Sequence, residues 1–229
     1  MALWAISDLH LSFGVKDKPM NVFGESWTNY EEKIRTNWIN LIKEEDTVIL
    51  AGDFSWGMYL SETKEDFEYL NALPGRKIML KGNHDYWWET LTKLNKFKKE
   101  NNYESVNFLH NNCYEFDGVY ICGTRAWEKG TEDVTAEQDE KVYNREKERL
   151  ERSLKLAPSD SKKIVVTHYN IGNNEGFLEI LKKYNVDVCI YGHLHGMIDR
   201  SKINYEKEGI KFICTSCDLI DFLPVKIEI

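Results

Sequence analysis

Short, uninterrupted apolar runs divide this chain and predict buried β-strands. They cover residues 3–6, 48–51, 78–80, 164–166 and 186–191. Continuous runs of this length are typical of strands covered on both faces, as in parallel sheets. Four of the five runs end directly at a polar motif, and the run at 78–80 reaches Asn83 shortly afterwards. Because strands of α/β folds open into ligand-binding loops at their carboxyl ends, these motifs are expected to converge at one sheet edge.

Helical periodicity fills the segments between these runs. The apolar positions from Ile34 to Ile42 form one stripe of a helix, Pro74-Gly75 predicts the end of another, and a run rich in Glu, Lys and Arg predicts an ion-paired surface helix. The expected helices cover residues 29–44, 67–73, 87–94 and 136–156. Helices alternating with buried strands indicate an α/β fold.

The second half of the chain also carries signals of antiparallel pairing. Asp117-Gly118 predicts a hairpin turn, and Glu208-Gly209 is expected to join two further strands. The strands concerned are 113–116 with 119–122, 202–205 with 210–214, and a last strand at 225–229. The sequence shows no linker, repeat or low-complexity segment, so we predict a single domain over residues 1–229.

Composition narrows the class of protein. The 229 residues are 42% hydrophobic and 13% aromatic, which fits a globular chain, and the formal net charge of −8 disfavours a large nucleic-acid footprint. The apolar start of the chain is too short for a signal peptide, and no run reaches the length of a membrane span. With five cysteines and no export signal, we expect reduced thiols and a cytoplasmic location.

Five of the six histidines fall in polar motifs that also carry Asp or Asn or that follow a predicted strand; only His110 stands apart. Asp8 and His10 are two residues apart, as are His193 and His195, so in extended backbone each pair would share a face. Histidine nitrogens with carboxylate or amide oxygens are ligands for divalent metals. Asp53 is alone in its motif and is the candidate to bridge two ions.

These motifs, in the order Asp-x-His, Gly-Asp, Gly-Asn-His-Asp, His and Gly-His-x-His, resemble those of the metallophosphoesterase (calcineurin-like) superfamily, and among its members a compact bacterial-type phosphohydrolase without a cap domain. The resemblance implies a four-layer α/β/β/α sandwich of two mixed sheets flanked by helices. It implies that Asp8, His10 and His195 bind one metal, that Asp53 bridges, and that Asn83, His168 and His193 bind the second. By the same resemblance, His84 is the acid for the leaving group and Asp85 orients His84. The residues after His168 lack the proline of many members, which implies a differently shaped loop.

Several other residues admit two interpretations. The tryptophans Trp56, Trp87 and Trp88 follow the predicted ligands and fit either a cleft wall or the core equally well. His110 is expected in a loop or turn outside the site. Cys214 and Cys217 are expected to be ordinary buried thiols. Arg125 is the basic side chain most readily placed near a substrate phosphate, although a surface ion pair is the commoner role of an arginine.

The leading hypothesis is a metal-dependent phosphoesterase that hydrolyses phosphomonoesters or phosphodiesters through a metal-bridging hydroxide. It would use two divalent ions, with manganese, iron, zinc and cobalt all compatible with such ligands. The expected partner is a small phosphorylated substrate, with no membrane. Two alternatives remain: a non-catalytic scaffold of the same fold, and a nuclease. The intact motifs favour an enzyme over the scaffold, and the acidic charge counts against the nuclease.

Overall fold

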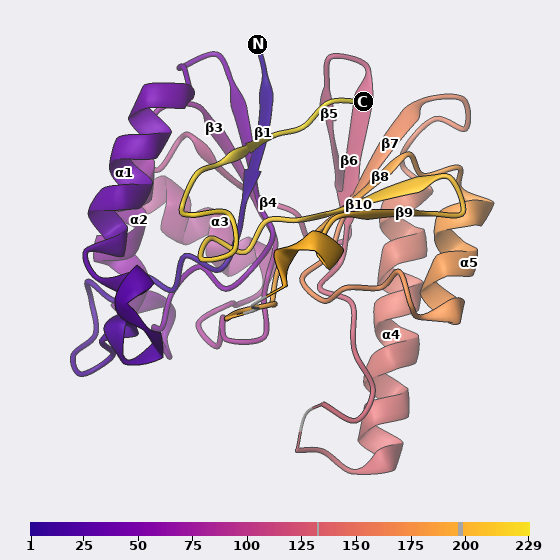
Figure 1. Cartoon of the computed structure of the whole chain (residues 1–229), viewed down its shortest axis with the longest axis horizontal. Helices are drawn as coiled ribbons and strands as arrows, with labels where there is room; N and C mark the ends of the chain where they lie inside the picture. Colours follow the sequence, from indigo (N-terminus) through magenta and orange to yellow (C-terminus); the bar gives the residue numbers. More distant parts are fainter. Residues whose placement is uncertain (132, 197–198) are drawn as a thin grey trace.

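Two β-sheets packed face to face form the centre of the molecule in the computed structural model, which describes residues 1–131, 133–196 and 199–229 (Figure 1). Within these residues, the first sheet comprises β1 (Leu3–Ile6), β2 (Thr47–Leu50), β3 (Arg76–Met79), β4 (Val106–Phe108) and β11 (Val225–Lys226). The second comprises β5 (Cys113–Phe116), β6 (Val119–Gly123), β7 (Lys162–Val166), β8 (Val188–Tyr191), β9 (Tyr205–Lys207) and β10 (Ile210–Cys214). Their spatial orders are β11-β1-β2-β3-β4 and β5-β6-β7-β8-β10-β9.

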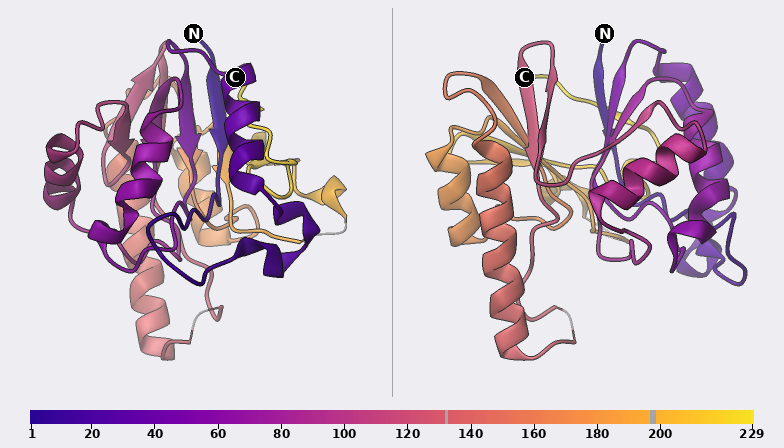
Figure 2. Two further views of the ribbon diagram at one scale, coloured as in Figure 1. Left: turned by 90° about the vertical axis from the view of Figure 1, so that its left-hand side faces the viewer. Right: turned by 180° about the vertical axis from the view of Figure 1, so that it is seen from behind.

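Helices cover the outer face of each sheet. The first sheet carries α1 (Tyr30–Leu41), α2 (Lys64–Asn71) and α3 (Leu91–Glu100), and the second carries α4 (Ala136–Leu154) and α5 (Glu175–Lys183). Figure 2 shows the two groups of helices on opposite sides of the paired sheets. The predicted α/β/β/α sandwich of two mixed sheets is therefore confirmed.

Three clusters of buried side chains hold the layers together. One lies between the sheets and joins residues such as Ile49 and Ile78 to Ile164 and Ile190. The other two lie under the helices, around Trp38 for the first sheet and around Leu150, Phe177 and Leu181 for the second. Central strands such as β2 are buried at every position. This burial on both faces explains why they are encoded as continuous apolar runs.

The pairing of the strands refines the expected topology. Strands β1 to β4 are parallel, and so are β6, β7, β8 and β10, whereas β5, β9 and β11 join antiparallel at the edges. The antiparallel pieces predicted for the second half therefore flank a parallel centre. Asp117 and Gly118 both have positive φ, 49° and 79°, as a type I′ hairpin requires. The predicted strand at 202–205 was placed too early, because Arg200–Lys202 forms a 3-10 turn and β9 begins at Tyr205.

The sequence patterns did not predict α5 and β4, and they predicted the start of α3 wrongly. Helix α5 buries Phe177, Leu178, Ile180 and Leu181, whose spacing in the sequence is that of an amphipathic helix. Strand β4 has only three residues, too few for a pattern. The helix expected from Trp87 starts at Leu91, because the Trp87 ring is packed in the core instead.

The cysteines and the apolar helices bear on two of the expectations from composition. All five cysteines are free thiols there. No helix in this part of the chain is both long and apolar enough to cross a bilayer.

Candidate metal centre

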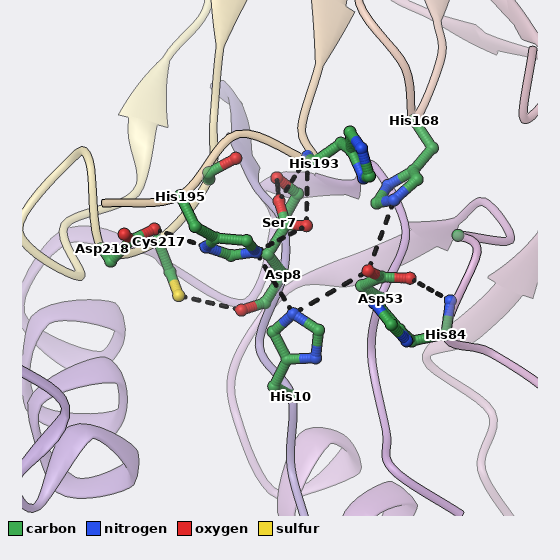
Figure 3. Close-up of polar contacts among 12 residues, drawn as sticks. Ser7, Asp8, His10, Asp53, His84, His168, His193, His195, Cys217 and Asp218 are labelled. Atoms are coloured by element: carbon green, nitrogen blue, oxygen red, sulfur yellow. Dashed lines mark hydrogen bonds and ion pairs between the residues drawn. The ribbon is translucent and has the colours of Figure 1, made fainter. Parts of the chain in front are cut away.

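The polar motifs converge where the carboxyl ends of the two sheets meet (Figure 3). Asp8 and His10 follow β1, Asp53 follows β2, and Asn83 follows β3 in the first sheet. The second sheet contributes His168 after β7 and both His193 and His195 after β8. Residues separated by most of the chain thus face one another, as the strand-end rule predicted.

The backbone that presents these side chains is left-handed at four positions. Asp8, His10, Asp53 and His193 have φ of 58°, 46°, 52° and 70°. The expectation that the paired residues share a face through extended backbone is therefore wrong for both motifs. Non-glycine residues in this region cost conformational energy and cluster at functional sites. Sharp turns at the strand ends, rather than strand alternation, aim the side chains inward.

Two glycines allow the loops to approach closely enough. A Cβ at Gly82 would lie 2.1 Å from Oδ1 of Asp53. A Cβ at Gly192 would lie 2.5 Å from Oδ2 of Asp8. Any side chain at either position would push a carboxylate out of the site, so close approach is the reason for glycine there.

Asp8, His10 and His195 form a first ligand group, whose donor atoms lie within 4.8 Å of one another. The Nε2 atoms of His10 and His195 are 3.3 Å apart, and His195 Nε2 is 3.5 Å from Asp8 Oδ1. Asp8 and His10 are buried. Three converging nitrogen and oxygen donors can act as the protein ligands of a metal ion.

Asp53, His168 and His193 form a second ligand group under the same distance limit. His168 Nε2 lies 3.3 Å from Asp53 Oδ2. Asn83 joins this group through its Oδ1, which is 2.6 Å from His168 Nε2 and 3.1 Å from His193 Nδ1. Asp53 Oδ2 is also 3.8 Å from His10 Nε2 of the first group. Asp53 Oδ2 therefore lies within 4 Å of one histidine from each group.

The hydrogen bonds of the histidines leave unshared electron pairs facing the centre. His168 Nδ1 donates to the Ala51 carbonyl at 3.0 Å, and His195 Nδ1 donates to Asp218 Oδ1 at 2.8 Å, which assigns these tautomers. In the neutral ring each Nε2 is then an acceptor, and His168 Nε2 faces another acceptor, the Asn83 Oδ1. Converging acceptors need either a proton or a cation between them, so the residues suit divalent ions.

The buried charges of the two groups also favour a cation. Burial by itself lowers the pKa of His168 and His195, but Asp53 raises the first to about 9, and Asp218 and Asp8 raise the second to about 10. Burial dominates at His10 and lowers its pKa to about 4. The carboxylates thus attract positive charge at the centre, which a metal ion would supply without protonating the ligands.

Three supporting residues were missed from the sequence. Asp218 is 6% exposed and binds the ring of His195. The Ser7 hydroxyl donates to the Asp8 carboxylate, and Cys217 Sγ donates to the Asp8 carbonyl at 2.9 Å. Asp218 follows the apolar strand β10, so the strand-end rule that found the other acids also pointed to it.

His84 lies beside the centre but outside both ligand groups. Its amide donates to Asp53 Oδ1 at 2.8 Å, and its ring centroid is 5.7 Å from that of His10. The proposed role of Asp85 in orienting His84 is not supported by the contacts. The Asp85 carboxylate instead accepts bonds from the amides of residues 53–55 and of Gly82, and from the Trp87 indole. Among the described residues it makes no bond with the His84 ring, so Asp85 holds the loops together.

The tryptophans divide between cleft and core. Trp56 stacks on His10, with ring centroids 4.8 Å apart, and lines a cavity of about 360 Å³ that also touches His84 and His195. Trp87 and Trp88 are buried in the core. His110 lies in the bend after β4, as expected for a loop histidine.

Arg125 lies apart from the cavity over the ligand groups. Its carbonyl accepts the amide of His168 at 3.0 Å, whereas its guanidinium lies over the Trp127 ring and lines a separate cavity. The surface ion pair that was the simpler interpretation is not seen in the described part of the chain.

Several known proteins are similar to this chain in sequence or in fold. An uncharacterized protein of Methanocaldococcus jannaschii is 29% identical over 128 residues, which are 53% of this chain and 67% of that protein. A solved structure of a protein of unknown function from Aquifex aeolicus has a TM-score of 0.53 at 22% identity, covering 98% of this chain and 95% of the other. Phosphopantetheinyl hydrolase from Mycobacterium tuberculosis has a TM-score of 0.60 at 14% identity, covering 99% and 95%. At these low identities the two solved structures show only that the fold is shared.

The family comparison covers most of the sequence. The model of the calcineurin-like phosphoesterases matches residues 1–197, a range that includes every residue of both ligand groups and His84. The chain belongs to the calcineurin-like phosphoesterase family.

Proposed function

We propose that this protein is a binuclear metal-dependent hydrolase of small phosphoesters. The observation that carries the proposal is the position of Asp53, whose Oδ2 is 3.3 Å from His168 and 3.8 Å from His10. One carboxylate between two ligand groups suits a pair of divalent ions. When bound, such ions activate water and polarise a phosphoryl oxygen. Manganese, iron, zinc and cobalt all suit nitrogen and oxygen ligands of this kind.

His84 is the proposed acid of the reaction. Its half-buried ring lines the cavity above the first ligand group, so it can reach a leaving group held there. It makes no part of either ligand group and is therefore available to transfer a proton. Trp27 and Trp56 form an aromatic side of the same cavity, next to His84. The free thiols suit the reducing cytoplasm as the place of action.

Two substitutions separate metal binding from proton transfer. Asp53→Asn is expected to lower bound metal and turnover together, because it removes the charge shared by both groups. His84→Ala is expected to keep the metal but lose about 10²- to 10⁴-fold in rate, the usual contribution of a general acid. Hydrolysis of a chromogenic phosphate ester with added manganese, against a chelated sample, measures the rate, and elemental analysis measures the metal.

Thr92→Ala serves as the control, because this exposed side chain on α3 lies outside both ligand groups and lines neither cavity. It is expected to change neither readout. Equal rates for His84→Ala and wild type would rule out the acid role. Wild-type protein that binds the metals but hydrolyses no ester would instead favour the scaffold alternative.

A further inference from the structure

A second cavity, of about 210 Å³, is lined in part by the loops that lead to Asn83 and His168, and it gathers positive charge. We call it the basic pocket and define it by Lys81, Arg125, Arg145 and Arg149, which all line it. The whole chain has a net charge of −8, so this concentration runs against its composition. Like charges held close together cost free energy unless an anion offsets them.

The protein itself supplies only part of that compensation. The buried Glu146 carboxylate lies 2.7 Å from Arg149 and 3.7 Å from Arg145. Glu146 also accepts a hydrogen bond from Thr124, which leaves little capacity for further donors. Within the described ranges, neither Lys81 nor Arg125 has a carboxylate within 4.0 Å. The pocket therefore keeps unpaired donors that point to an anionic ligand.

The basic pocket adjoins the metal centre through its backbone. Lys81 directly precedes the Gly82-Asn83 turn of the second ligand group. The Arg125 carbonyl accepts the amides of His168 and Tyr169, so its loop and the His168 loop are joined. Arg145 and Arg149 close the opposite wall from one face of α4, the long helix that extends beyond the second sheet in Figure 1. A substrate that crosses these shared loops would place one group at the metal centre and another at these donors.

We propose that the basic pocket binds a second phosphate-class group of the substrate, remote from the phosphoryl group that is hydrolysed. Arginines suit such a group because their planar forks bind phosphate oxygens in pairs. Glu146 orients Arg149 without neutralising the pocket. The preferred substrate is accordingly a bisphosphorylated small molecule. This substrate preference rests on the proposed hydrolase activity, whereas the binding of an anion by the basic pocket does not.

A pair of related esters tests the selectivity. The KM for glucose 1,6-bisphosphate is expected to be about tenfold below that for glucose 1-phosphate, measured by phosphate release. Arg125→Gln and Arg145→Gln are expected to raise the first KM about tenfold more than the second. Arg152→Gln, an exposed site on the same helix outside the pocket, is the control and should change neither. Equal KM values for the two esters, or equal shifts in both, would overturn the proposal.

Binding of inorganic phosphate tests the pocket without turnover. In calorimetry on the Asp53→Asn variant, which is expected to bind metal weakly, phosphate should still bind. Adding Arg125→Gln and Arg145→Gln should reduce that affinity at least tenfold, whereas adding Arg152→Gln should not. Unchanged affinity in the double-arginine variant, or no phosphate binding before the arginines are replaced, would sink the inference. If the pocket binds phosphate but no ester is hydrolysed by wild type, only the proposed activity fails.

Discussion

Single side chains behind the ligands control how well the ligands are aimed. Asp218 illustrates this, because one oxygen accepts from His195 Nδ1 at 2.8 Å and the other accepts from the Gly196 amide at 2.9 Å. The first bond sets the tautomer of His195 and leaves its Nε2 free for the first ligand group. The second fixes the loop that carries the ring. A carboxylate in this position also makes the imidazole a stronger donor to metal.

Replacing Asp218 is expected to weaken one metal site selectively. Asp218→Ala should lower the affinity of the first ligand group for its metal by about 10- to 100-fold, as is usual when a supporting partner is removed. Asp218→Asn keeps an acceptor and should have a smaller effect. Competition with a metal-binding dye measures both affinities. Asp221→Ala removes a neighbouring exposed carboxylate and is the control. An equally large loss of metal affinity in Asp221→Ala would contradict a positioning role for Asp218.

At the scale of secondary structure, helix α2 joins the loops that carry ligands. Asp66, in the first turn of α2, accepts the Phe13 amide at 2.8 Å through one oxygen. Its other oxygen accepts the hydroxyl of Ser55. These contacts tie the loop after β1 and the loop after β2 to one helix. The carboxylate is fully buried, so its ionised form is disfavoured, and burial raises its pKa to about 6.

The raised pKa of Asp66 predicts how stability changes with pH. The folded state holds this proton more tightly than the unfolded state, whose pKa is near 3.8. Its stabilisation is present below pH 4 and is lost as the pH rises to about 6. Above that pH the buried charge costs about 3 kcal/mol. Asp66→Asn keeps a neutral group of the same shape and should remove this part of the decline in the free energy of unfolding.

Urea unfolding with chelator at pH 4.5 and pH 7.5 measures the effect. The stability of Asp66→Asn relative to wild type should be about 2 kcal/mol higher at pH 7.5 than at pH 4.5. Glu68→Gln changes an exposed carboxylate elsewhere on the same helix and controls for charge alone. Parallel pH curves for wild type and Asp66→Asn would show that Asp66 does not titrate in this range.

At the scale of the whole molecule, the metal centre spans the junction of the two sheets. The first ligand group takes Asp8 and His10 from the first sheet and His195 from the second. The second group takes Asp53 from the first sheet and His168 and His193 from the second. Bound ions would therefore hold the two sheets together at this edge. Deeper in the molecule, the apolar cluster between the sheets also holds the two sheets together.

Removing metal is expected to lower the stability of the entire fold. Ions present at 1,000 times their dissociation constant stabilise a folded protein by about 4 kcal/mol. For a chain of this length that corresponds to roughly 10 °C in Tm. Thermal unfolding with manganese and with chelator measures the shift, and Asp53→Asn should show much less of it. A wild-type Tm that does not respond to chelator would contradict a metal site spanning both sheets.

Local patterns were sufficient for most of the fold and for the identity of the candidate ligands. Apolar runs located β1, β2, β3, β7 and β8, because strands buried on both faces need them. The motifs at their ends identified both ligand groups. The conformation of the turns could not be predicted from the sequence, since the left-handed backbone at Asp8 and His193 depends on contacts between distant loops. The boundary of α3 failed for a similar reason, because Trp87 packs into the core.

The sequence by itself therefore determined the strands, the resemblance to the family and the residues that could bind metal, because each depends on neighbours along the chain. Only the tertiary structure decided what Asp85, Asp218 and Asp66 do, because their hydrogen bonds reach loops far away in sequence. The basic pocket is the clearest case. Its cations come from β3, β6 and α4 regions that no local pattern connects, and folding alone brings their charges together.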